Sequence, residues 1–228
     1  MVRQAMRMPR TARATVGGMC YHVMNRGNRQ AQVFDTPSDY WEFIDLMYKA
    51  QARVPIALLA ACLMPNHFHF VMRPRTGGDI GRWMHWLLTT HASRRCMRLE
   101  INGHVWQGRY KAFPIEEDEH LLTVMRYVER NALRAGLVRR AEAWAWGSLN
   151  WRTSGVNRTL LTSSPISLPD DWVTYVNTPH SSAELEALRN CVNRQRPYGS
   201  NVWVNRMASQ LGLESSLRPV GRPRKAKT

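Results

Sequence analysis

Acidic residues are scarce in this chain. Its 228 residues contain 17 Asp and Glu but 32 Lys and Arg, so the formal net charge at pH 7 is +15 and the isoelectric point is near 10.6. Such an excess of positive charge is typical of a protein that binds a polyanion. The composition therefore indicates nucleic acid as the first class of partner and an acidic membrane surface as the second.

Long hydrophobic runs are absent as well. The longest apolar run, residues 54–64, has eleven residues and contains Pro55, so it is too short to span a bilayer. The N-terminus is basic and lacks the apolar segment of a signal peptide. We therefore expect no membrane partner and a cytoplasmic location.

Cysteine is sparse, and its spacing forms no motif. The chain has four cysteines, and none of them belongs to a C-x-x-C pair. This excludes a disulfide framework and a cysteine-based zinc site, and it predicts reduced, mostly buried thiols. The four residues are Cys20, Cys62, Cys96 and Cys191.

The sequence at 63–72 (LMPNHFHFVM) predicts a strand with two histidines on one face. Successive side chains of a strand point to opposite faces, so His67 and His69 would share one face and Phe68 and Phe70 the other. Two imidazoles above a packed core could hold a divalent metal and leave room for oxygen ligands. A His-x-His pair is also often incidental in a strand, and both readings stay open on these residues alone.

The order of the predicted elements indicates an α+β fold. Strands are expected at 18–24, 54–62, 66–74 and 104–113, and helices at about 35–53 and 80–99. The order strand, helix, strand, strand, helix, strand is that of a ferredoxin-like split βαβ antiparallel sheet with helices on one face. We expect the opposite face of the sheet to be free for a ligand.

A polar loop follows the first predicted strand. It contains Asn25, Arg26, Asn28 and Arg29, whose side chains could contact phosphates or base edges. An ordinary solvated turn explains the same residues equally well.

A further helix is predicted from Asp118 to Gly136. On it, Tyr127, Asn131 and Arg134 are spaced four and three apart and therefore lie on one stripe beside the core-facing stripe. A carboxamide oxygen is a neutral ligand for magnesium or manganese. The alternative is a tyrosine that packs its ring and an asparagine that caps a neighbouring group.

Four segments within residues 17–150 form a combined pattern: 21–28 (YHVMNRGN), 64–69 (MPNHFH), 106–111 (WQGRYK) and 126–138 (RYVERNALRAGLV). Together they resemble the single-tyrosine transposases of the HUH superfamily, and within them the REP-associated tyrosine transposases of bacteria. One departure is Ala132-Leu133 in place of the Pro-Val that often follows the asparagine. It affects the helix backbone and leaves the chemical groups unchanged.

The resemblance implies roles for particular residues. Tyr127 would be the nucleophile, and His67, His69 and Asn131 would bind a divalent cation, Mg²⁺ or Mn²⁺. Candidate DNA-binding residues are Asn25, Arg26, Asn28, Arg29, Arg109, Lys111, Arg134, Arg222 and Arg224.

The predicted domain organisation runs beyond these motifs. We expect a basic arm at 1–16, the HUH single-tyrosine transposase domain at 17–152, a linker or loop region at 153–180, a small helical appendage at 181–214 and a basic tail at 215–228. The tail carries Arg222 and Arg224 and resembles an AT-hook, whose arginines lie in the minor groove of A·T tracts. A disordered basic tail is the alternative.

The resemblance implies a metal-dependent single-stranded DNA endonuclease and strand transferase. It would cleave and rejoin DNA at palindromic REP-type hairpins through a 5′-phosphotyrosine intermediate, in the bacterial cytoplasm and associated with the nucleoid. Two alternatives stay open, a non-catalytic DNA-binding regulator on the same fold and an RNA-binding protein. Both a monomer and a dimer are compatible with the sequence.

Overall fold

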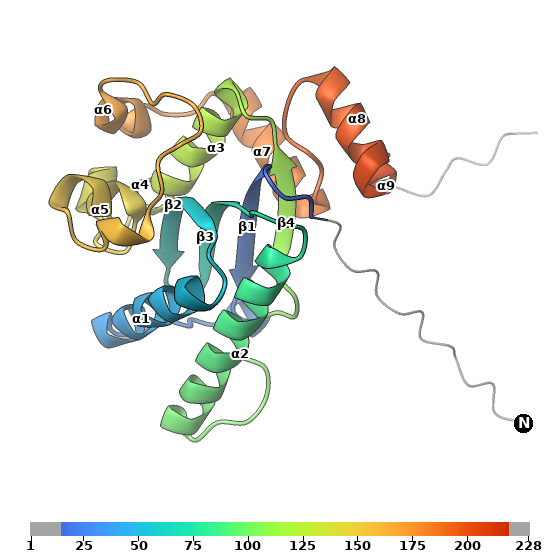
Figure 1. Ribbon diagram of the computed structural model, residues 1–228. Coiled ribbons are helices and arrows are strands. Elements are labelled where there is room, and N and C mark those ends of the chain that lie inside the picture. The colour runs from blue at the N-terminus through green and yellow to red at the C-terminus, as the bar shows by residue number, and fades with distance from the viewer. Residues whose placement is uncertain (1–14, 219–228) are drawn as a thin grey trace, which may run out of the picture.

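A four-stranded antiparallel sheet organises the chain in the computed structural model, which describes residues 15–218 (Figure 1). Its strands are β1 (Cys20–Arg26), β2 (Ala57–Met64), β3 (His67–Arg73) and β4 (Lys111–Ile115), in the order β2-β3-β1-β4. All three pairings are antiparallel. This is the order of the ferredoxin-like split βαβ sheet, and the predicted fold class is confirmed.

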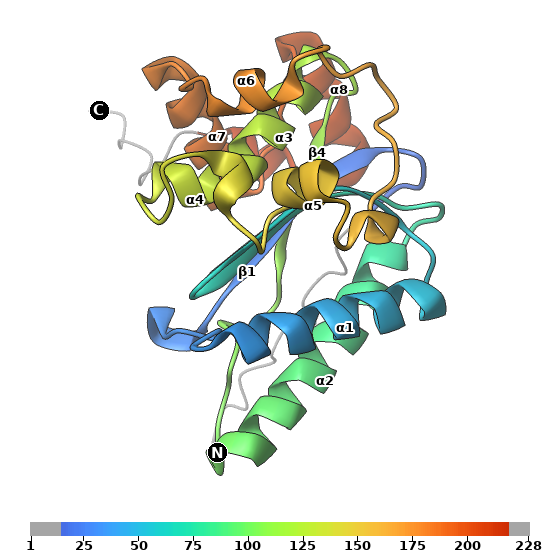
Figure 2. The ribbon, with the colours of Figure 1, turned by 90° about the vertical axis from the view of Figure 1, so that its left-hand side faces the viewer.

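The two crossover helices cover one face of the sheet. They are α1 (Pro37–Arg53) and α2 (Asp79–Leu99), and Figure 2 shows them side by side on that face. Helix α1 begins at a capping box between Thr36 and Asp39, with Pro37 in its first turn. Its buried stripe, which includes Phe43 and Met47, packs in the same core as Phe68 and Phe70 of β3.

The opposite face of the sheet is also covered, so the expectation that it stays free is wrong. Helix α3 (Glu119–Glu129) packs across β2, β3 and β4 and lies with shorter helices on this side (Figure 2). The reason is that the strands carry apolar side chains on both faces, and Leu59, Val71 and Phe113 are buried against α3. A sheet that is apolar on both faces needs cover on both.

Two predicted elements differ in extent. Residues 104–110 form a loop before β4, because Gly108 adopts a positive φ of 81° that interrupts an extended strand. The helix predicted to run from Asp118 to Gly136 is divided at Arg130 into α3 and a short helix, α4 (Asn131–Arg134). Its predicted end is confirmed, since Gly136 has a φ of 73°.

The C-terminal third packs against the sheet domain through short helices. They are α5 (Ser148–Ser154), α6 (Trp172–Asn177), α7 (Ser182–Arg194), α8 (Asn201–Leu211) and α9 (Glu214–Leu217), with 3-10 turns η1 (Asn28–Gln30), η2 (Ala141–Ala143) and η3 (Arg158–Leu160). The stretch 153–180, expected as a linker or loop, contains α6, whose Trp172 is buried in the core around α3. The segment between α7 and α8 extends the sheet edge, because Tyr198 bridges Ile115 in parallel.

Within residues 15–218, no helix combines the length and the apolar composition needed to cross a membrane. Residues 1–14 of the basic arm and 219–228 of the tail, with Arg222 and Arg224, lie outside the described residues. The AT-hook and the domain boundaries therefore stay predictions.

A buried carboxylate joins α3 to its neighbours at the end of the helix. Glu129 is 1% exposed and accepts hydrogen bonds from Ser148 Oγ at 2.5 Å, Arg152 Nε at 3.1 Å and Trp172 Nε1 at 2.6 Å. Ser148 Oγ in turn accepts from the backbone of Ala61 in β2 at 2.9 Å. This network fixes the end of α3 against α5, α6 and β2.

We expect Glu129→Ala to lower the free energy of unfolding by about 3–5 kcal/mol, because it leaves the partly buried Arg152 guanidinium without its counter-ion and removes the acceptor of the buried Ser148 and Trp172 donors. Urea denaturation measures the change. Glu186→Ala is the matched control, since Glu186 is exposed and no ion pair involves it within residues 15–218; its effect should stay within about 0.5 kcal/mol. Equal effects of the two substitutions would show that the network contributes nothing.

Candidate active site

The histidine pair lies on the face of the sheet that α3 covers. His67 and His69 are in β3, opposite Arg26 and Met24 of β1. Their ring centroids are 5.0 Å apart and the rings are nearly perpendicular. The expectation that they share one face, with Phe68 and Phe70 in the core on the other, is confirmed.

Three residues from α3 and α4 face the histidines across a pocket. The Tyr127 ring lies edge-on to His69 at a centroid distance of 5.8 Å, and Asn131 and Arg134 follow on α4. The pocket has a volume of about 420 Å³, and all five of these side chains line it. The stripe predicted on the helix and the pair predicted on the strand therefore meet at one site.

Arg134 links the residues of this site. Its Nη2 donates to Asn131 Oδ1 at 2.8 Å and to Tyr127 Oη at 3.4 Å, and its guanidinium carbon lies 4.6 Å from the centroid of the Tyr127 ring. Its Nε is buried without a partner, and no carboxylate forms an ion pair with it within residues 15–218. The site therefore presents a cation that lacks a counter-ion.

Both histidines are held in the neutral form. Burial lowers the pKa of His67 to about 4, and the nearby charges of Arg26 and Arg134 act in the same direction. Burial likewise holds the pKa of His69 well below its usual range, together with the neighbouring His22 and His67. A neutral imidazole is the form that binds metals.

The hydrogen bond at His67 determines which ring nitrogen is left for a ligand. His67 Nδ1 lies 2.6 Å from Asn66 Oδ1, and Asn66 Nδ2 donates to Gln30 O at 3.1 Å. The Asn66 oxygen can only accept, so His67 Nδ1 carries the proton and donates it. His67 Nε2 then keeps its lone pair, as in histidines that bind metals.

The polar loop after β1 packs against the loop at 103–110 near the histidine end of β3. Gly27 bridges Trp106, and Gln107 N donates to Arg26 O at 2.8 Å. Asn25 is buried, and its Nδ2 donates to Gly108 O at 3.1 Å. Asn25 thus joins the two loops. Because it is buried, the prediction that it contacts DNA directly is not supported.

The other candidate DNA-binding residues lie in different positions around the site. Arg26 lines the histidine pocket, whereas Arg109 lines a separate cavity of about 600 Å³ between α2 and the loop at 103–110. That cavity is larger but contains none of the four residues of the predicted catalytic centre. Arg29 is exposed, and Asn28 and Lys111 are half-buried.

Helix α7 contributes residues that sequence reasoning missed. Arg189, Val192 and Asn193 line the histidine pocket, although they come from the segment expected as a separate appendage. Their spacing of three and four places them on one helix face, but nothing in that spacing indicates what the face meets.

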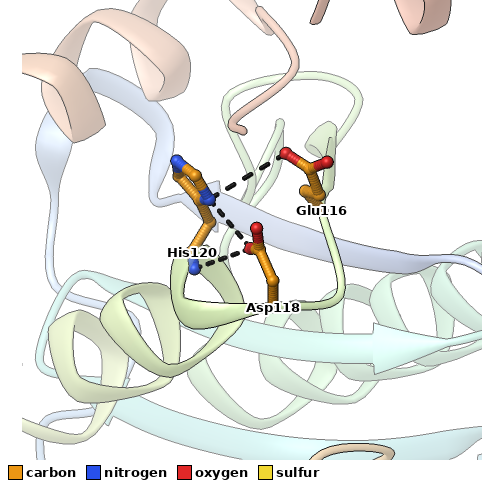
Figure 3. A group of neighbouring side chains, drawn as sticks. All are labelled: Glu116, Asp118 and His120. Carbon is orange, nitrogen blue, oxygen red and sulfur yellow. Dashed lines mark hydrogen bonds and ion pairs between the residues drawn. The ribbon is translucent and has the colours of Figure 1, made fainter. Parts of the chain in front are cut away.

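A second group of potential ligand atoms lies elsewhere. Glu116, Asp118 and His120 place one ligand atom each within 4.8 Å of one another (Figure 3). Asp118 Oδ1 accepts from His120 N at 2.9 Å and caps α3, while Glu116 Oε2 accepts from Ser200 N at 2.6 Å at the start of α8. These carboxylates stabilise helix N-termini, which accounts for the cluster without a metal.

Comparison with known proteins assigns the family. A family model described as IS200-like transposase matches residues 15–131, about half of the chain. The chain belongs to this family. The resemblance to tyrosine transposases found in the sequence is thereby confirmed, and membership implies a transposase-like, DNA-binding function.

One solved structure supports the same fold. A REP-associated tyrosine transposase bound to a REP hairpin aligns with a TM-score of 0.53 and 17% sequence identity, over 77% of this chain and 100% of that one. A Deinococcus radiodurans R1 protein described as a transposase is also 17% identical, with a TM-score of 0.38, over 54% of this chain and 97% of that one. No curated protein matches this chain.

Proposed function

We propose that this transposase-family protein cleaves and rejoins single-stranded DNA at palindromic, REP-type hairpins, with Tyr127 as the nucleophile. The observation that carries the proposal is the meeting of Tyr127, His67, His69 and Asn131 in one pocket, although they come from β3, α3 and α4. The choice of a hairpin substrate is supported by the REP hairpin bound to the transposase of similar fold.

The donor atoms of the pocket fit a divalent cation. His67 and His69 are neutral imidazoles, and the Nδ1 of each is occupied by a hydrogen bond, so that Nε2 is left over. Asn131 is 2% exposed and supplies a carboxamide oxygen. The amide oxygen and substrate oxygens suit Mg²⁺ or Mn²⁺, whereas imidazole ligands favour transition-metal ions, so the mixed donor set fits Mn²⁺ better than Mg²⁺. When bound, such a cation would neutralise charge on the scissile phosphate.

Tyr127 performs the covalent step in this account. Its Oη attacks phosphorus, the new bond joins Oη to the 5′-phosphate, and the bond from phosphorus to the 3′-oxygen breaks. The phenol proton passes to solvent and the departing 3′-oxygen takes up a proton, which leaves a free 3′-hydroxyl. Attack by a 3′-hydroxyl reverses the step and rejoins the strand without ATP, because the phosphodiester is conserved.

Arg134 is positioned to assist this step. Its guanidinium lies beside Tyr127 Oη and has no counter-ion among the described residues. It can stabilise negative charge on the phenol oxygen and bind the phosphate that approaches it. A phosphate in the pocket would supply the missing counter-ion.

One alternative function is less compatible with the fold. RNA-binding domains of this sheet topology stack bases on the exposed sheet face. Here that face is covered by α3 and its neighbours, and Tyr127 and the two histidines lie in the pocket between α3 and the sheet.

A non-catalytic DNA-binding regulator would use the same basic surface. The adduct experiment below distinguishes such a regulator from an enzyme. The cytoplasmic, nucleoid-associated location and the oligomeric state stay predictions.

The adduct experiment uses a labelled single-stranded REP-type hairpin with Mn²⁺, followed by a denaturing gel. We expect a covalent protein–DNA band for the wild-type protein and none for Tyr127→Phe, which removes only the hydroxyl and its 3.4 Å contact with Arg134. Tyr48→Phe is the control, because the Tyr48 hydroxyl bonds Thr159 on the surface, and it should keep the adduct. An adduct with Tyr127→Phe would refute the assignment; DNA binding without any adduct would favour the regulator.

Arg189 on α7 should contact a phosphate of the bound strand, because it is exposed at the pocket and has no ion-pair partner within residues 15–218. We expect Arg189→Ala to weaken binding and to make the slope of log affinity against log salt shallower by about 0.7. Fluorescence anisotropy over a salt series measures both. Arg206→Ala removes the same charge from α8, outside the pocket, and should leave the slope unchanged. Equal slopes for the wild type and Arg189→Ala would exclude the contact.

A further inference from the structure

His22 in β1 lies in segment 21–28 and next to the histidine pair of β3. It is 1% exposed and lies on the same face of the sheet as His69. Its Nε2 is 2.8 Å from His69 Nδ1, and the ring centroids are 5.0 Å apart. His22 does not line the pocket itself; its ring contacts His69 and lies edge-on to the Tyr127 ring at a centroid distance of 6.3 Å.

The position of the proton between the two rings determines whether His69 Nε2 presents a lone pair or an N–H to the pocket. A 2.8 Å hydrogen bond between two ring nitrogens needs one donor and one acceptor, so one of the two facing nitrogens carries the proton and the other a lone pair. If His69 Nδ1 donates, the lone pair of His69 Nε2 is available to a cation. If His22 Nε2 donates instead, His69 carries its proton on Nε2, and that nitrogen cannot be a ligand.

The surrounding charges favour the first arrangement. Arg26 and Arg134 line the pocket together with His69, whereas His22 does not, so positive charge lies on the pocket side of His69. A lone pair directed toward positive charge is more stable than an N–H directed toward it. The arrangement also matches His67, whose Nδ1 donates to Asn66 Oδ1. Its cost is an N–H on His22 Nδ1, which is buried without a partner.

We infer that His22 is a positioning residue that accepts the Nδ1 proton of His69 and thereby keeps His69 Nε2 free to bind a divalent cation. The metal part of this inference rests on the proposed function, whereas the tautomer of His69 is a property of the metal-free protein. The two parts can therefore fail separately.

Three substitutions of His22 distinguish the effect of its acceptor nitrogen from the effect of its side-chain volume. His22→Gln places an amide oxygen near the position of Nε2, His22→Asn places one near Nδ1, and His22→Phe fills the space without an acceptor. His91→Phe is the matched control, because His91 is also 1% exposed and neither of its ring nitrogens has a partner among the described residues. His91 lies on α2, on the other face of the sheet.

Titration calorimetry with Mn²⁺ gives the first readout. We expect His22→Phe and His22→Asn to weaken Mn²⁺ binding by about 10- to 100-fold, as loss of a ligand's supporting hydrogen bond does. His22→Gln should stay within a few-fold of wild type, and His91→Phe should match it. Equal affinity in wild type, His22→Phe and His22→Asn would overturn the inference, as would equal losses in all three His22 variants.

Nitrogen-15 NMR of the metal-free protein gives the second readout. We expect His69 to be protonated on Nδ1 in the wild type and on Nε2 in His22→Phe, because a buried Nδ1–H would then lack an acceptor. A wild-type protein with the proton on His69 Nε2 would contradict the inference. If the wild type shows the expected tautomer but binds no Mn²⁺, the metal in the proposed function is wrong and the role of His22 stands.

Discussion

The alternation of side chains along β3 is the constraint on which the rest of the structure depends. It directs Phe68 and Phe70 into the core under α1 and α2, and it directs His67 and His69 to the other face. A one-residue shift in pairing with β1 would exchange these faces, and the cost of burying two imidazoles among aromatic rings opposes it. The same packing that stabilises the domain therefore fixes the register of the site.

Several polar groups of the site lack hydrogen-bond partners or counter-ions within the described residues. The Nε atoms of Arg26 and Arg134 are buried without partners, and burial keeps the histidines uncharged. Each of these features costs folding free energy. A phosphate and a cation would complete them together, since the phosphate pairs with the guanidiniums and the cation with the imidazole lone pairs. Local destabilisation of this kind is characteristic of functional sites.

Local patterns in the sequence predicted the parts of the site that depend on one element. Period-two alternation placed the histidines, and helical spacing placed Tyr127 near Asn131 and Arg134. What the sequence could not predict depends on contacts between distant segments. Arg189 reaches the pocket only because α7 packs there, and Asn25 is buried only because the loop at 103–110 covers it. The sequence did not predict that α3 covers the second face of the sheet. The apolar run of β2 indicated a buried strand, but it did not indicate which element packs on each of its two faces.

We propose that β3, α3 and α4 together form a single metal-binding site for phosphodiester chemistry. Anomalous scattering from crystals of the protein soaked in Mn²⁺ would locate the bound cation. We expect one strong anomalous peak between His67, His69 and Asn131, beside Tyr127. A peak at Glu116, Asp118 and His120 with none in the pocket would contradict it, because the cation would then lie away from the nucleophile.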